Sequence, residues 1–115
     1  MKKKEILRNQ RNFASVYKRG KSKGSKYVVV LYKRNGLAYS RVAFLASKKV
    51  GNSVQRNRAR RLMREAYRTM NRELRRGYDV IFVARNTVND RKMNDVQKAM
   101  FGAMRAADLL ENQDR

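Results

Sequence analysis

The sequence predicts an α+β fold, in which one small sheet has helices packed on it. Segments with helical periodicity alternate with β-branched and aromatic runs along the chain, and the length of 115 residues suits one compact core. The six glycines are dispersed and proline is absent, so no linker is indicated. We therefore expect residues 1–115 to form a single domain, with residues 1–5 flexible.

The first helix is predicted over residues 9–19. Asn9 is a suitable N-cap, and Gly20 is a typical residue after a helix end. Phe13 and Tyr17 are four residues apart, so their side chains share one face of this helix.

Two strands are predicted next. Residues 21–26 form a Gly/Ser/Lys loop with at most a short extended piece, and Tyr27–Tyr32 is a β-branched and aromatic run typical of a strand. Asn35 and Gly36 predict a tight turn. A second strand is expected from Leu37 or Arg41 through Ala46.

The second half predicts a helix, a strand and a helix. Residues 51–53 (Gly-Asn-Ser) supply a break and a helix cap, after which apolar residues recur at helical spacing over residues 54–72. Residues 78–83 are apolar on both faces, as in an interior strand. Residues 86–90 read as a turn, and residues 91–110 as the last helix.

The charge limits the classes of partner. Thirty Lys and Arg oppose nine Asp and Glu, which gives a formal net charge of +21. Self-repulsion lowers stability, and a polyanion relieves it; nucleic acid is the first candidate and an anionic membrane surface the rival. No apolar stretch approaches the ~18 residues of a transmembrane helix. The basic start is not followed by a signal-peptide core, so we expect a cytoplasmic protein.

Common catalytic and metal-binding residues are missing from the composition. The chain has no Cys and no His, which excludes thiolate and histidine metal sites and a Ser-His-Asp triad. A nuclease acting alone would need clustered carboxylates. Asp79, Asp90 and Asp95 follow no ligand spacing, so we expect no catalytic residue and no metal site in the protein.

An arginine-rich segment points to a function. Six of the thirteen residues 56–68 are Arg, with Glu65 as the only acid among them. Arginines four residues apart repel one another, and cations at a helix N-terminus oppose the macrodipole. A solvated cationic face is the simpler reading, but the net charge favours a guanidinium surface that binds the phosphates of structured RNA.

The same segment carries a family resemblance. Residues 47–67 read SKKVGNSVQRNRARRLMREAY, which closely resembles the signature of the bacterial ribonuclease P protein family; Ser53 stands where Ala is usual. The resemblance extends to the first helix, to Tyr27–Tyr32 and to residues 78–85. It implies a four-stranded sheet with three helices, of the ribosomal protein S5 domain 2-like type. It also implies a left-handed βαβ crossover around the arginine helix, against the general right-handed rule.

The resemblance implies a protein subunit of a ribonucleoprotein endoribonuclease. Its partners would be a catalytic RNA, which works with Mg²⁺, and precursor tRNA, whose 5′ leader is removed. The protein itself would hold no cofactor. The expected RNA contacts are Lys48, Lys49, Asn52, Arg56, Asn57, Arg58, Arg60, Arg61, Arg64 and Arg68. The expected floor of a leader cleft is Phe13, Tyr17 and Tyr32, since aromatic rings stack on unpaired bases.

Three other functions are compatible with the composition. A ribosomal or general RNA-binding protein would share the charge but not the ordered motif. A metal-dependent nuclease would need an acid cluster. A DNA-compacting protein would bind duplex DNA as well as structured RNA at equal salt.

Overall fold

A computed structural model describes residues 2–111 and contains every helix and strand that the sequence predicts. The helices are α1 (Gln10–Arg19), α2 (Ser53–Arg68) and α3 (Met93–Ala106). The strands are β1 (Lys21–Gly24), β2 (Val28–Arg34), β3 (Arg41–Ala46) and β4 (Tyr78–Ala84). Short 3-10 turns cover Lys3–Glu5, Asn71–Glu73 and Asn86–Val88. The predicted α+β class is confirmed.

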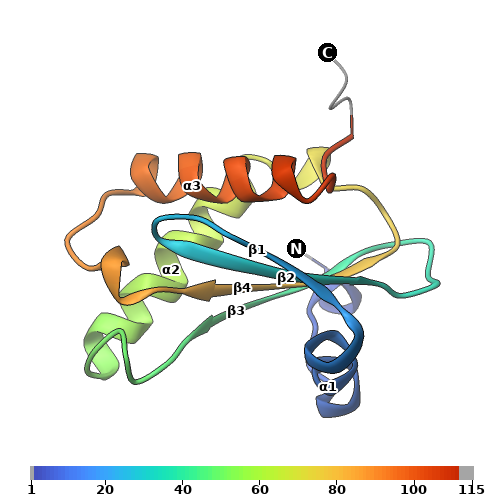
Figure 1. The fold of residues 1–115 in the computed structure, drawn as a ribbon, viewed down its shortest axis with the longest axis horizontal. Coiled ribbons are helices and arrows are strands. Elements are labelled where there is room, and N and C mark those ends of the chain that lie inside the picture. The colour runs from blue at the N-terminus through green and yellow to red at the C-terminus, as the bar shows by residue number, and fades with distance from the viewer. Residues whose placement is uncertain (1, 112–115) are drawn as a thin grey trace.

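The four strands form one mixed sheet in the order β1-β2-β4-β3. β2 is antiparallel to both β1 and β4, whereas β3 and β4 are parallel and are connected through α2. Helices α2 and α3 cover one face of the sheet and α1 lies against the other (Figure 1). The four strands, the three helices and the βαβ unit agree with the expectation; the hand of the crossover stays a prediction from the resemblance.

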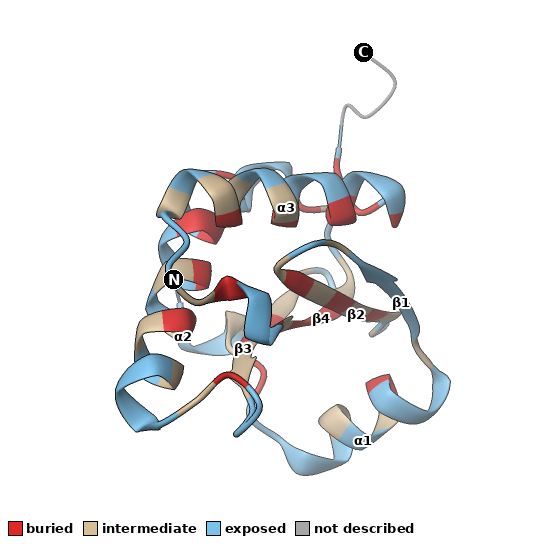
Figure 2. Cartoon of the chain, turned by 60° about the vertical axis from the view of Figure 1, so that its left-hand side comes forward, coloured by how far each residue is buried: buried red, intermediate tan, exposed pale blue. Residues whose placement is uncertain are grey.

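Strand alternation divides the core into two parts. Val28, Val30 and Tyr32 of β2 join the larger cluster, which lies under α2 and α3. The smaller cluster on the α1 side contains Ile81, with Leu31 partly buried against it. Helix α1 covers this side of the sheet incompletely. Most of α1 is exposed, and only its inner face packs on the sheet (Figure 2).

Both long helices are shorter than predicted. The sequence pattern placed the second helix over residues 54–72, but α2 ends at Arg68 and a 3-10 turn carries the next apolar residues into the core. The last helix was expected over residues 91–110, but α3 ends at Ala106. Asp108 adopts a positive φ of 57°, which turns the chain so that Leu109 is buried without continuing the helix.

Two segments outside the predicted helices and strands have regular structure. Residues 21–24, predicted as loop with at most a short extended piece, form the edge strand β1. Residues 3–5 form a turn, and Ile6 bridges to Val42 beside β3; the flexibility of residues 1–5 stays a prediction. Residues 1 and 112–115 lie outside the described part of the predicted domain. None of the helices within residues 2–111 has the length and hydropathy that a bilayer crossing requires.

Candidate nucleic-acid interface

The start of α2 is fixed by a reciprocal cap. The Asn52 side chain accepts a hydrogen bond from the Gln55 backbone N–H at 2.9 Å, and Gln55 Oε1 accepts one from the Asn52 N–H at 2.8 Å. Gly51 has a φ of 142°, and a Cβ at this position would overlap the Gln55 side chain. The cap explains Asn52 and Gly51 structurally, while the expected RNA contact of Asn52 stays a prediction.

One side of α2 holds the helix on the protein. Ala59, Met63, Ala66 and Tyr67 are buried, as the apolar spacing predicted. The Tyr67 ring packs at a tilt against Phe44 and Phe82, with ring-centroid distances of 5.7 Å, which holds the helix against β3 and β4. The arginines on the remaining sides are therefore displayed from a rigid element.

Most cations of the predicted RNA-binding set have no polar partner within the described residues. Arg58 donates from Nη2 to the Arg91 carbonyl at 2.6 Å, and Arg60 donates to the Asn57 side chain within α2. Glu65 forms no ion pair with any residue of 2–111. The other cations of the set form no side-chain hydrogen bond and no ion pair with residues 2–111. They are Lys48, Lys49, Arg56, Arg61, Arg64 and Arg68.

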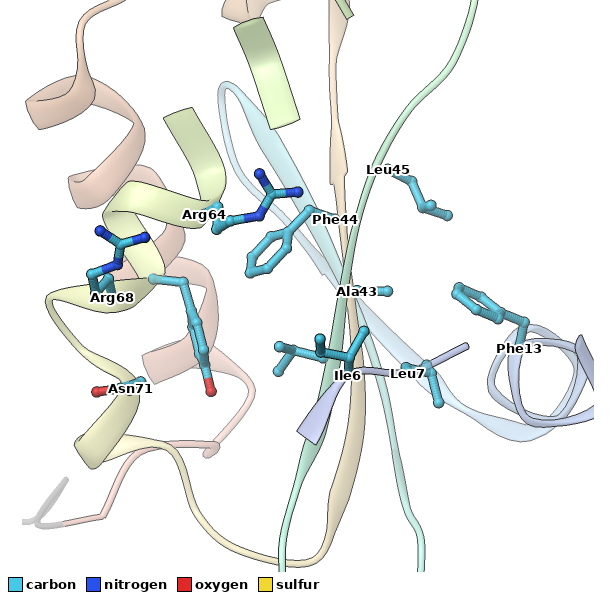
Figure 3. Close-up of a pocket in the computed structure, with 11 residues that line it drawn as sticks. Ile6, Leu7, Phe13, Ala43, Phe44, Leu45, Arg64, Arg68 and Asn71 are labelled. Carbon is cyan, nitrogen blue, oxygen red and sulfur yellow. The ribbon is translucent and has the colours of Figure 1, made fainter. Parts of the chain in front are cut away.

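A pocket of about 360 Å³ lies where α2 meets the outer edge of β3. Figure 3 shows the Arg64 and Phe44 side chains on one side of β3 and Phe13 on the other. The Arg64 guanidinium carbon lies 5.9 Å from the Phe44 ring centroid, and Arg68 lines the same pocket. The structure thus brings arginines of the RNA-binding set and one aromatic of the leader set to a single sheet edge.

Tyr67 also lines this pocket. Burial raises the pKa of Tyr67 far above its ordinary value, and the nearby Glu5 carboxylate adds to the rise.

The aromatic residues of α1 differ in exposure. Phe13 is half-buried and packs against the cluster of Leu7, Val16, Ala43 and Ile81 on the α1 face of the sheet. Tyr17 is 54% exposed although it shares the helix face. Phe13 is therefore partly a core residue, whereas the Tyr17 ring is open to solvent.

Tyr32 corrects the predicted cleft. It is buried in the cluster under α2 and α3, on the face of the sheet opposite Phe13. Successive side chains of a strand point to opposite faces, and Leu31 takes the position toward α1. The grouping of Tyr32 with Phe13 and Tyr17 in one cleft is wrong. Residues 27–32 are apolar at every position, so the sequence did not indicate which of them face α1.

Asp79 and Asp95 have structural roles in the described part of the chain. Asp79 is held by Arg41 with an Nη2–Oδ2 distance of 2.7 Å, and Asp95 accepts from the backbone at the start of α3. No group of three or more acids suited to a metal ion occurs among residues 2–111.

A comparison with known families identifies the chain. The family model described as Ribonuclease P matches residues 1–108. The chain belongs to the ribonuclease P protein family. Ribonuclease P protein components from Alkaliphilus oremlandii (strain OhILAs) and Clostridium botulinum (strain 657 / Type Ba4) resemble it at 40% and 38% identity. These matches cover 92% and 93% of this chain, and 93% and 97% of the relatives.

Solved ribonuclease P proteins share the fold. A Staphylococcus aureus ribonuclease P protein mutant, described as defective in mRNA degradation activity, superposes with a TM-score of 0.85 at 26% identity, covering 93% of this chain and 91% of its own. The Thermotoga maritima ribonuclease P protein gives 0.77 at 29% identity, covering 85% and 93%. The chain is thus a subunit of the ribonucleoprotein endoribonuclease that processes tRNA, and its partner is ribonuclease P RNA.

Proposed function

We propose that the exposed cations of α2 and the preceding loop bind the catalytic RNA through its phosphates. The observation that carries this proposal is a set of cations, including Arg61 and Arg64, to which residues 2–111 supply no side-chain hydrogen bond or ion pair, on a helix that its buried face holds rigid. Guanidinium groups form paired hydrogen bonds with phosphate oxygens, and a rigid helix lowers the entropy cost of ordering them.

The α1 face of the sheet is our candidate for the 5′ leader of precursor tRNA. Tyr17 offers an exposed ring, Phe13 a half-buried one, and Leu31 and Leu45 extend the apolar surface beside them. Stacking on such rings accepts any base sequence, while nearby cations attract the backbone. Tyr32 is not part of this proposal.

Cleavage is assigned to the RNA and its Mg²⁺, in the cytoplasm. The protein supplies leader binding and positive charge that lets RNA segments approach one another. Its best-placed buried acid, Asp79, is committed to Arg41 and does not fit a protein-held ion. Purified protein without RNA should therefore show no metal-dependent hydrolysis of precursor tRNA, and sustained hydrolysis would contradict this assignment.

The α2 proposal is tested with Arg61→Gln plus Arg64→Gln. Neither side chain has a polar partner among residues 2–111, so folding should survive. Binding to a bacterial ribonuclease P RNA, measured over a salt series, should weaken. The log–log salt slope should become shallower by about two units if each arginine neutralises one phosphate.

The matched control is Arg72→Gln plus Lys98→Gln. Both residues are exposed and lie outside the predicted RNA-binding set. The two substitutions remove two positive charges, as the Arg61/Arg64 pair does. The control pair should change the slope by less than half as much. Equal slopes for the two double variants would contradict α2 as the RNA-binding helix.

A further inference from the structure

A second basic pocket lies at the end of the sheet that is far from the start of α2. It is formed where α1 ends and β1 begins, beside the last residues of β2 and the first of β4. Strand β4 begins with Tyr78 at this end of the sheet and finishes with Ala84 at the other end. Because β3 runs parallel to β4, β3 also finishes at the Ala84 end, and α2 starts beyond it. Six residue steps along a strand separate the two ends by about 20 Å.

Tyr32 supplies a buried donor to this pocket. Its side chain is 9% exposed, its ring belongs to the core cluster, and it lines the pocket. No residue of 2–111 forms a hydrogen bond with its hydroxyl. A phosphate oxygen held in the pocket could therefore accept a hydrogen bond from this hydroxyl.

Four cations surround the same pocket: Arg19, Lys21, Lys33 and Arg34. None of them forms an ion pair with a described carboxylate. The Arg34 guanidinium carbon lies 5.5 Å from the Tyr78 ring centroid, which holds it beside the pocket, and Lys33 reaches only a backbone carbonyl, at 3.3 Å.

Local stability does not account for this set of cations. Arg19 is in the last turn of α1, where the helix dipole favours a cation. Lys21, Lys33 and Arg34 are on strands, where no dipole stabilises them and their mutual repulsion is a cost. The one acid at the pocket, Asp108, already pairs with Arg75 at 3.2 Å.

We propose that this pocket binds a phosphodiester group of the RNA, with the Tyr32 hydroxyl donating to a phosphate oxygen and the strand cations neutralising its charge. The inference rests on the proposed RNA-binding function for the identity of the polyanion, and adds a second anchor to it. Two anchors on different elements of one rigid fold fix the orientation of the protein on the RNA. A single anchor at α2 would leave that orientation free.

The charge of the pocket is tested with Lys21→Gln plus Arg34→Gln. Binding to ribonuclease P RNA should weaken about tenfold at moderate salt, and the salt slope should become shallower by about two units. The double variant Arg72→Gln plus Lys98→Gln serves again as the control of equal charge. A loss no larger than that of the control would overturn the proposal.

The donor is tested separately with Tyr32→Phe, which removes one oxygen and keeps the ring. RNA binding should weaken about tenfold or more, the loss expected for one hydrogen bond to a charged group. The melting temperature of the free protein should not fall, because the hydroxyl has no partner within residues 2–111. A lower melting temperature with unchanged RNA binding would give Tyr32 a purely structural role and overturn the assignment.

Footprinting of the RNA distinguishes this inference from the α2 proposal. The Lys21/Arg34 variant should lose protection at RNA positions different from those lost by the Arg61/Arg64 variant. Loss only with the Arg61/Arg64 variant refutes the second anchor and leaves the α2 proposal intact. Loss only with the Lys21/Arg34 variant refutes the α2 proposal and leaves the anchor intact.

Discussion

Arg41 and Asp79 form a two-pronged ion pair across the parallel strands β3 and β4. Arg41 Nε lies 2.8 Å from Asp79 Oδ1 and Nη2 lies 2.7 Å from Oδ2, and the two residues are direct partners in the strand register. The hydrogen bonds to Asp79 raise the pKa of Arg41 above its ordinary value. Asn35 donates to the same carboxylate at 3.0 Å, so the turn after β2 is tied to this pair.

Asp79→Ala should destabilise the protein by about 3 kcal/mol. Removing one member of a buried ion pair typically costs about 3–5 kcal/mol, and the lower end applies because the Arg41 side chain is 20% exposed. Chemical unfolding of the free protein measures the change. Glu65→Ala is the control, since its exposed carboxylate pairs with nothing in 2–111 and should change stability by less than about 0.5 kcal/mol. Similar values for both variants would show that the ion pair contributes little.

Gly20→Ala should destabilise the protein by about 1–3 kcal/mol, the usual range for overpacking. The φ of Gly20 is an ordinary −81°, but an added Cβ would overlap the Val16 carbonyl oxygen and lie 2.7 Å from that of Tyr32. Gly102→Ala is the opposite case, because it is exposed in α3 with no atom within 4 Å of an added Cβ.

Gly102→Ala should stabilise the helix by about 0.5–1 kcal/mol. Thermal melts of the two alanine variants should therefore shift in opposite directions. A Gly20→Ala melt at or above that of the unmodified chain would show that the junction of α1 and β1 can open without cost.

Tyr17→Ala should weaken binding of precursor tRNA to the reconstituted enzyme by about 1–3 kcal/mol, if its ring stacks on a leader base. Mature tRNA has no leader, so its binding should barely change. Tyr17 is a cleaner test than Phe13, because Phe13 packs in the core and its loss also leaves a cavity.

The control for Tyr17→Ala is Phe101→Ala, an exposed aromatic of α3 on the other side of the sheet. Phe101→Ala should not distinguish the two tRNAs. Equal losses for precursor and mature tRNA with Tyr17→Ala would remove Tyr17 from the leader site.

Local sequence signals predicted the helices and strands because each one has its own period and cap. Asn9 and Asn52 are the N-caps in the structure, where their residue type indicated helix starts. Asn35 and Gly36 do form a turn, but it joins strands that are not neighbours, since β4 lies between β2 and β3. That insertion depends on pairing with residues more than forty positions away, which no local pattern encodes.

The candidate site was predictable only in part for the same reason. The arginine set follows from helical spacing within one segment, so its display on α2 could be foreseen. The side of the sheet on which the Tyr32 side chain lies depends on which side α1 covers. Its position beside Arg34 and Tyr78 depends on the ends of three strands meeting. Neither relation has a signal within residues 27–32 themselves.

The position of β4 between β2 and β3 has a consequence for synthesis on the ribosome. The arginine helix ends at Arg68, before the strand that must enter the middle of the sheet at residues 78–84. When Arg68 has just left the ribosome, β4 has not yet been made. Strands β2 and β3 are then not joined, so the sheet on which α2 packs is incomplete. Long-range pairing of this kind is slow compared with helix formation. The basic segment is therefore synthesised before the strand that completes the sheet beneath it.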